Sequence, residues 1–283
     1  MEDYIVKKII FIILCIFIGV TGCTKKSEIN KNTAKDNNTK EEIIEVQKDK
    51  QEKLEDEIIN TYEHVKPKQW GEALEGVVRY LDSDNKEIAL TLDACGGKNG
   101  SKYDKELIDF LEKEKIPATL FINYRWIEAN KDIFMELSKN NNFEIENHGY
   151  SHKPLSANKK SIYNIEGTSN VKEVIKEIKL NEDQIYKLTG KKTKYFRSGT
   201  AYYDEVAIKV ANKLGYKIAG FSINGDGGAT FSKEEIISEV SKAKSRDIII
   251  SHFNQPNGNT YEGLKEALIK LREEGYKFVK LEN

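Results

Sequence analysis

From residue 76 to the end of the chain, short apolar segments alternate with amphipathic segments of helical period. Strands are expected at 87–92, 118–122, 143–146, 194–196, 216–221, 248–250 and 278–281, and helices at 103–115, 131–139, 170–188, 204–214, 233–244 and 261–274. Strands that alternate with helices pair in parallel. A further strand at 77–81 is expected to form an N-terminal hairpin with the first of these. The pattern predicts an α/β fold, either an open doubly wound sheet or a closed or nearly closed barrel.

Polar and titratable side chains directly follow several of these strands. In a barrel, the carboxyl ends of the strands form the face where several loops build the active site together. An open sheet concentrates its site at one crevice and does not need so many strand ends. The placement therefore favours a barrel. The candidate site residues chosen on this basis are Asp93, His148, His152, Arg197, Asp226 and His252.

Histidine is rare in this chain, and three of its four histidines follow predicted strands. His148 and His152 lie four positions apart in a loop, where two imidazoles can converge on one metal ion. His252 ends a buried strand and is suited to proton transfer. Taken singly, the spacing of His148 and His152 is a weak signal that two ordinary surface histidines also explain, and His252 can be a core histidine. A lone aspartate after a strand, such as Asp93, is more often a helix cap or a turn former. Their gathering at one barrel face favours a metal site with acid–base groups.

The first 23 residues are predicted to direct secretion. Two lysines precede an apolar run at 9–20, which is too short to span a bilayer as a helix and fits the core of a signal peptide. Residues 20–23, Val-Thr-Gly-Cys, resemble a bacterial lipobox, in which residues 1–22 are removed and Cys23 is lipidated. An uncleaved anchor is the alternative. Both place the folded domain outside the cytoplasm, attached to the cell membrane.

Residues 23–62 are predicted to be a disordered tether. They are rich in charged and small polar side chains and cannot bury enough apolar surface to offset the entropy of ordering. Within them, residues 41–59 carry enough apolar positions to be partly helical. The net charge of −1 argues against a nucleic-acid partner. Beyond Cys23, the only thiol is Cys95, so no internal disulfide is expected.

The order of these residues resembles the polysaccharide deacetylases of carbohydrate esterase family 4, the NodB-homology domain, over residues 75–283. The match is closest at Asn147–His152, which reads Asn-His-Gly-Tyr-Ser-His where the family has N-H-[ST]-x-x-H. The third and fourth motifs are degenerate. In chain order, the five matching segments are Thr91–Gly96, Asn147–His152, Phe196–Thr200, Asn224–Asp226 and Ile249–His252.

The resemblance implies a distorted (β/α)7 barrel that binds Zn²⁺ or another divalent metal through His148 and His152. The family's third metal ligand is an aspartate, and Ala94 stands at that position here. Three accounts are open. Asp93 itself binds the metal; or another side chain reaches in; or the two histidines hold the ion weakly and ordinary activity is lost. The side chains considered for the second account are Cys95, Glu146 and Asp226.

The resemblance also implies catalytic roles. Asp93 matches the general base that takes a proton from water, and His252 matches the general acid that protonates the leaving amine. Arg197 matches the residue that orients and ionises the base, and Asp226 the acid that tunes His252. The backbone N–H of Thr200 matches the oxyanion donor.

Two functions follow from this interpretation. The first is a metal-dependent hydrolase that removes N-acetyl or O-acetyl groups from a cell-envelope or related polysaccharide. The alternative is a surface glycan-binding lipoprotein with a degenerate deacetylase site. In either case we expect a monomer that contacts a polysaccharide and, through its lipid anchor, the membrane. Three aromatic side chains are expected near the rim, to stack on sugar rings or to serve in packing: Trp126, Tyr202 and Tyr203.

Overall fold

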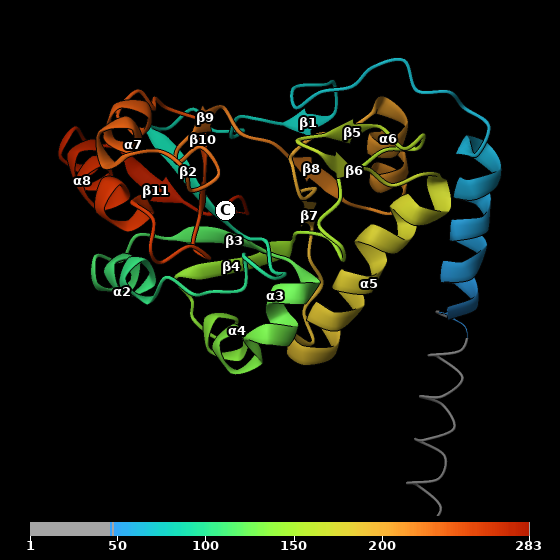
Figure 1. The fold of residues 1–283 in the computed structure, drawn as a ribbon, viewed down its shortest axis with the longest axis horizontal. Coiled ribbons are helices and arrows are strands. Elements are labelled where there is room, and N and C mark those ends of the chain that lie inside the picture. The colour runs from blue at the N-terminus through green and yellow to red at the C-terminus, as the bar shows by residue number, and fades with distance from the viewer. Residues whose placement is uncertain (1–45, 47, 283) are drawn as a thin grey trace, which may run out of the picture. The chain divides into compact units, whose positions relative to one another are not determined.

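The computed structural model of the protein describes residues 46 and 48–282. The chain divides into two compact units, residues 1–50 and 51–283. Of the first unit, residues 46 and 48–50 are described and are helical. The elements of the second unit are, in chain order, β1 (Val77–Val78), β2 (Glu87–Ala94), α2 (Lys105–Lys113), β3 (Ala118–Ile122), α3 (Tyr124–Ala129), α4 (Lys131–Leu137), β4 (Phe143–Asn147), β5 (Ser161–Ile162), β6 (Ile165–Glu166), α5 (Val171–Thr189), β7 (Tyr195–Phe196), α6 (Glu205–Lys213), β8 (Lys217–Ala219), β9 (Ile223–Asn224), α7 (Lys233–Val240), β10 (Ile248–His252), α8 (Thr260–Glu273) and β11 (Lys277–Val279) (Figure 1).

One nine-stranded sheet carries the fold, and its strand pairs are parallel. The strand order is β1-β8-β7-β4-β3-β2-β10-β9, and β11 pairs with the N-terminal part of β2. Only residues 220–222 separate β8, which pairs with β7, from β9, which pairs with β10. This short link joins the two sides of the sheet, so the sheet curls into a distorted barrel. The predicted α/β barrel architecture is confirmed.

Helices cover the sheet over two apolar clusters. One cluster holds the buried side chains of α2, α7 and α8 together with alternate residues of β2. The second holds most of the buried apolar side chains of α5 and α6. In Figure 1, α7 and α8 accordingly lie side by side over β2, β10 and β11, away from the pair α5 and α6. The central strands β2, β3 and β10 are almost entirely buried, which explains why they read as apolar runs in the sequence.

The predicted N-terminal hairpin is wrong. β1 pairs in parallel with β8, with Val77 opposite Ile218, and does not pair with β2. The chain between β1 and β2 is instead tied to the segment before β10, because the Leu81 N–H donates to the carbonyl of Arg246. A turn-rich segment between two β-like runs predicts a hairpin from local sequence alone. The strand that actually pairs with β1 is β8, about 140 residues later in the chain, and no local sequence pattern indicates this pairing.

Part of the predicted tether is helical and packed. Residues 51–62 form a helix, and Ile58 is 2% exposed within the cluster of α5 and α6. The following segment is held by α6, because the Glu205 carboxylate accepts hydrogen bonds from the backbone N–H groups of Lys68 and Gln69. The compact unit therefore begins well before residue 75. Although this helix is mostly charged, its few apolar side chains bury enough apolar surface against α5 and α6 to hold it in place.

The remaining N-terminal predictions lie outside the described residues. These are the signal peptide at 1–22, the lipidation of Cys23 and the tether up to residue 45. Within residues 46 and 48–282, none of the helices combines the length and the apolar character that crossing a membrane requires.

Candidate active site

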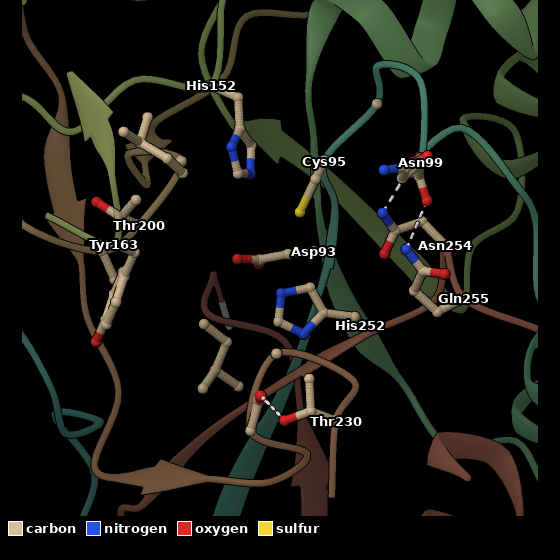
Figure 2. A pocket seen from close by; sticks show the side chains of 18 of the residues that line it. Asp93, Cys95, Asn99, His152, Tyr163, Thr200, Thr230, His252, Asn254 and Gln255 are labelled. Atoms are coloured by element: carbon tan, nitrogen blue, oxygen red, sulfur yellow. Dashed lines mark hydrogen bonds between the residues drawn. The ribbon is translucent and has the colours of Figure 1, made fainter. Parts of the chain in front are cut away.

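The carboxyl ends of β2, β4, β7 and β10 face one cavity of about 650 Å³. Asp93 ends in it from β2, His152 from the loop after β4, Thr200 from the loop after β7, and His252 from β10. Figure 2 shows the side chains of Asp93, His152 and His252 turned toward a common space, with the sulfur of Cys95 among them. The topology thus brings together residues that are up to 159 positions apart in the chain.

Strand β2 decides which side chains of the first motif reach the cavity. Successive side chains of a strand point to opposite faces. Leu92 and Ala94 belong to the apolar cluster under α2, α7 and α8, and both are fully buried. Asp93 and Cys95 lie on the other face and line the cavity. The position at which the resemblance places a metal-binding aspartate therefore faces away from the site.

A buried ion pair holds Asp93 in place. Its Oδ1 accepts a hydrogen bond from Arg197 Nη1 at 2.7 Å, and the two side chains are 2% and 0% exposed. Arg197 also donates to Thr91 Oγ1 at 2.9 Å and to the carbonyl of Gly220 at 3.0 Å. Its guanidinium carbon lies 4.2 Å from the centre of the Phe121 ring. An arginine fixed on so many sides orients the carboxylate.

Three metal-binding side chains converge beside Asp93. The ligand atoms of Cys95, His148 and His152 all lie within 4.8 Å of one another. Cys95 Sγ is 3.8 Å from His148 Nε2, which in turn is 3.6 Å from Asp93 Oδ2. Burial by itself raises the pKa of the Cys95 thiol, but the charge of His152 and hydrogen bonds from the neighbouring histidines outweigh it and hold that pKa well below its usual value. The thiolate is the form that binds metals.

The loop that carries the two histidines is fixed by a glutamate of α5. The Glu177 carboxylate, 3% exposed, accepts hydrogen bonds from the backbone N–H groups of Ser151 and Lys153. Between them, His152 has a φ of 61°, in the left-handed region that costs a non-glycine residue about 1–3 kcal/mol. The glutamate therefore holds a strained turn that aims His152 at the cavity. Nothing in the sequence pattern indicates this role, because Glu177 lies on a helix with many charged residues.

His252 is backed by a buried carboxylate. Asp226, 0% exposed, accepts hydrogen bonds from His252 Nδ1 at 2.9 Å and from the His252 backbone N–H at 2.7 Å. The N–H of Gly228 and the hydroxyl of Thr260 also donate to it. Burial by itself favours the neutral imidazole, but the Asp226 charge outweighs burial and holds the pKa of His252 well above its usual value. The ring can therefore carry a proton at neutral pH and release it into the cavity.

Of the other predicted residues, some lie at or near the cavity and some are buried in the interior. Thr200 lines the cavity, and its buried hydroxyl oxygen has no hydrogen-bond partner among the described residues. Trp126 and Tyr203 are fully buried and cannot stack on a sugar. Tyr202 is partly exposed and contacts two aromatic rings that the sequence interpretation did not connect with it, Trp70 at 5.7 Å and Tyr163 at 5.8 Å between centroids.

The donor set fits a divalent metal. The Nδ1 of His148 lies 3.0 Å from the carbonyl of Arg197, a contact that fixes the ring and leaves Nε2 for a ligand. The Nε2 of His152 is buried and has no hydrogen-bond partner among the described residues. Of the alternative third ligands, Glu146 is occupied by the backbone N–H groups of Lys194 and Tyr195. Two imidazoles and a thiol are a donor set that suits zinc.

Residues 81–219 match the family model described as polysaccharide deacetylase. The match ends before Asp226 and His252, so their assignment depends on geometry. A curated relative, the bifunctional xylanase/deacetylase of Pseudobutyrivibrio xylanivorans, is 24% identical over 197 residues. The aligned part is 69% of this chain and 30% of that protein, so the chain spans less than a third of that relative's length.

Solved structures of carbohydrate esterase family 4 share this fold. PdaA of Bacillus subtilis, a family 4 carbohydrate esterase, matches with a TM-score of 0.59 and 22% identity over 80% of this chain and 86% of that one. BA3943 of Bacillus anthracis, a CE4 family pseudoenzyme, matches with a TM-score of 0.58 and 21% identity over 70% of this chain and 64% of that one. At these identities the likeness shows the fold. Together with the family match, it supports a polysaccharide deacetylase domain in this chain.

Proposed function

We propose that this protein is a metal-dependent hydrolase that removes N-acetyl or O-acetyl groups from a cell-envelope or related polysaccharide. The observation that carries the proposal is the register of β2 and β10. It places Asp93 directly opposite His252 on the neighbouring strand, beside the Cys95, His148 and His152 set. Each of the two is backed by a buried partner of opposite charge. A surface that only binds glycan does not need this arrangement.

The proposed reaction divides the proton transfers between these two residues. A divalent metal, when bound, polarises the acetyl carbonyl by Lewis-acid action. Asp93, oriented by Arg197, takes a proton from the attacking water. His252, kept protonated by Asp226, gives a proton to the departing nitrogen or oxygen of the sugar. The backbone N–H of Thr200 stabilises the negative charge that develops on the carbonyl oxygen.

Sugar rings are proposed to stack near the rim. Tyr163, from the β5–β6 hairpin, is 65% exposed and lines the cavity. It contacts Tyr202, which contacts Trp70, so the three rings form a continuous aromatic edge. Aromatic rings that are partly wet suit a ligand with both apolar and hydroxyl faces.

A second function is kept because of one comparison. BA3943, whose fold this chain shares, is described as a pseudoenzyme. A glycan-binding lipoprotein with a degenerate site is therefore the alternative. Both functions are proposed for a monomer that the lipidated Cys23 anchors to the outer face of the cell membrane, a proposal that depends on the lipobox pattern.

Acetate release from acetylated glycans distinguishes the two functions. We expect activity that a chelator abolishes and zinc restores. Asp93→Asn and His252→Gln should each lower kcat by about 10²–10⁴ and change KM less, since each removes a proton transfer made in the transition state. Tyr186→Ala is the matched control, because Tyr186 is exposed on α5 and does not line the cavity. Metal-loaded protein that releases no acetate from peptidoglycan, chitooligosaccharide, xylan or acetyl esters would establish the binding function instead.

A further inference from the structure

We infer that the Cys95 thiolate is the third protein ligand of the metal, so that the site is Cys-His-His. The inference rests on the metal that the proposed function requires. Cys95 would then supply the third ligand, which Ala94 cannot supply, and a thiolate ligand changes which metals the site prefers.

Distances within the cluster match those of ligands that share one ion. On a tetrahedral zinc with Zn–N about 2.0–2.1 Å and Zn–S about 2.3 Å, a nitrogen and a sulfur ligand lie about 3.6 Å apart. Cys95 Sγ and His148 Nε2 are 3.8 Å apart. His152 completes a group whose ligand atoms are all within 4.8 Å of one another. No large rearrangement is needed for these three atoms to surround one ion.

The backbone around Cys95 holds the thiol in this position. On its N-terminal side, residues 91–94 are paired with β3. On its C-terminal side, the Gly96 N–H donates to the carbonyl of Gly100, and Arg125 donates to the carbonyl of Cys95 itself. Gly96 has a φ of 68°, and a Cβ there would lie 2.5 Å from the backbone nitrogen of Trp126. Because Gly96 can turn tightly at this point, Cys95 stays on the face of Asp93 and its sulfur points into the cavity (Figure 2).

Asp93 is the competing candidate, because its Oδ2 lies 3.6 Å from His148 Nε2. Its other oxygen is bound to the buried Arg197 cation, which competes with a metal for the carboxylate charge. The sulfur of Cys95 instead contacts His148, which is itself a candidate ligand of the same ion. Cys95 therefore binds the metal, and Asp93 remains available as the general base.

A thiolate in place of a carboxylate makes the site softer. Thiolates select zinc and similar metals, whereas carboxylates suit manganese and magnesium. The site is therefore expected to take zinc or cobalt and to discriminate against manganese. Cys95→Asp should reverse this preference in part, because an aspartate at the same position supplies a harder oxygen ligand.

Cobalt spectroscopy tests the inference without relying on activity. The full chain with Cys15→Ala and Cys23→Ala keeps Cys95 as its single thiol. After removal of metals and addition of Co²⁺, we expect one equivalent to bind and an intense thiolate-to-cobalt charge-transfer absorption to appear in the near ultraviolet. Cys95→Ser should lose this absorption and bind zinc at least about tenfold more weakly. Cys95→Asp should bind cobalt without the absorption.

The outcomes separate this inference from the proposed function. Stoichiometric cobalt without the charge-transfer absorption would overturn Cys95 as a ligand and leave a metal-dependent hydrolase standing. Failure to bind any metal would remove both. The absorption in a protein that releases no acetate would support the ligand and reject the hydrolase. The spectrum of the protein with Cys95 intact decides the question even if a variant fails to fold.

Discussion

Replacement of Arg197 by methionine is expected to destabilise the fold strongly. Methionine keeps most of the length and volume of the side chain and removes its charge. Asp93, 2% exposed, is then left as a buried carboxylate without a counter-charge. Breaking a buried ion pair by removing one partner costs about 3–5 kcal/mol. The carbonyl of Gly220 also loses its donor, which costs about 1–3 kcal/mol when the acceptor stays buried. Because such losses overlap, we expect about 4 kcal/mol in total.

Urea and thermal unfolding of the metal-free protein measure this loss. For a domain of this size, about 4 kcal/mol corresponds to a fall in Tm of about 8–16 °C. The double variant Asp93→Asn, Arg197→Met removes the stranded charge as well, so it should be more stable than Arg197→Met alone by about 2 kcal/mol. An Arg197→Met protein within about 1 kcal/mol of the wild type, or a double variant less stable than the single one, would refute the reasoning.

Three further predictions address the loop, the rim and the anchor. Burial raises the pKa of Glu177 to about 7 from an ordinary 4.5. The folded chain therefore keeps a proton that the unfolded chain has lost, and this contribution, present in full below pH 4.5, disappears as the pH rises through 7. At 1.36 kcal/mol per pKa unit, the wild type loses about 3 kcal/mol of stability from this group as the pH rises from 4.5 to 8. Glutamine cannot lose a proton, so the stability of metal-free Glu177→Gln relative to the wild type should increase by about 3 kcal/mol over the same range. No relative change in urea unfolding over that range would contradict it. Tyr163→Ala should raise KM for a glycan about three- to tenfold with little change in kcat, since an aromatic contact is worth about 0.5–1.5 kcal/mol; an unchanged KM would exclude Tyr163 from the sugar site. Cys23→Ala should release the protein from the membrane fraction or block its cleavage, and membrane-bound protein of mature size would reject the lipid anchor.

Much of the fold could be predicted because most of its longer strands and helices have a recognisable local pattern of apolar residues. The apolar run at 118–122 coincides with β3, and the stripe of apolar residues on α5 ends at Gly190, whose φ of 69° ends the helix as expected. Pairing between distant segments is a different matter. Val77 pairs with Ile218 at one end of the strand order, and no local pattern encodes that partner. The two-residue strands β5, β6 and β9 are too short to show any period.

The candidate site was predictable where chemistry and strand ends coincide. Asp93, Arg197 and His252 each stand at the carboxyl end of a strand, and a parallel barrel necessarily brings such ends together. Glu177 could not be found this way. It lies in the middle of a helix, and its importance comes from two backbone N–H groups in a loop 24–26 residues earlier. A residue that acts on backbone leaves no pattern of side-chain types.

The first motif shows how a resemblance and a strand period can disagree. Motif order places the third metal ligand at position 94, and alanine there argues for a lost site. Strand period argues otherwise, because Asp93 must face the cavity to meet Arg197, and a two-residue period then returns Cys95, not Ala94, to the same face. The alanine fills an apolar layer with Leu92, where a carboxylate would be buried without a partner. The residue that supplies the ligand therefore follows from the direction of the backbone at the strand end, and Cys95 takes the place that the motif assigns to its neighbour.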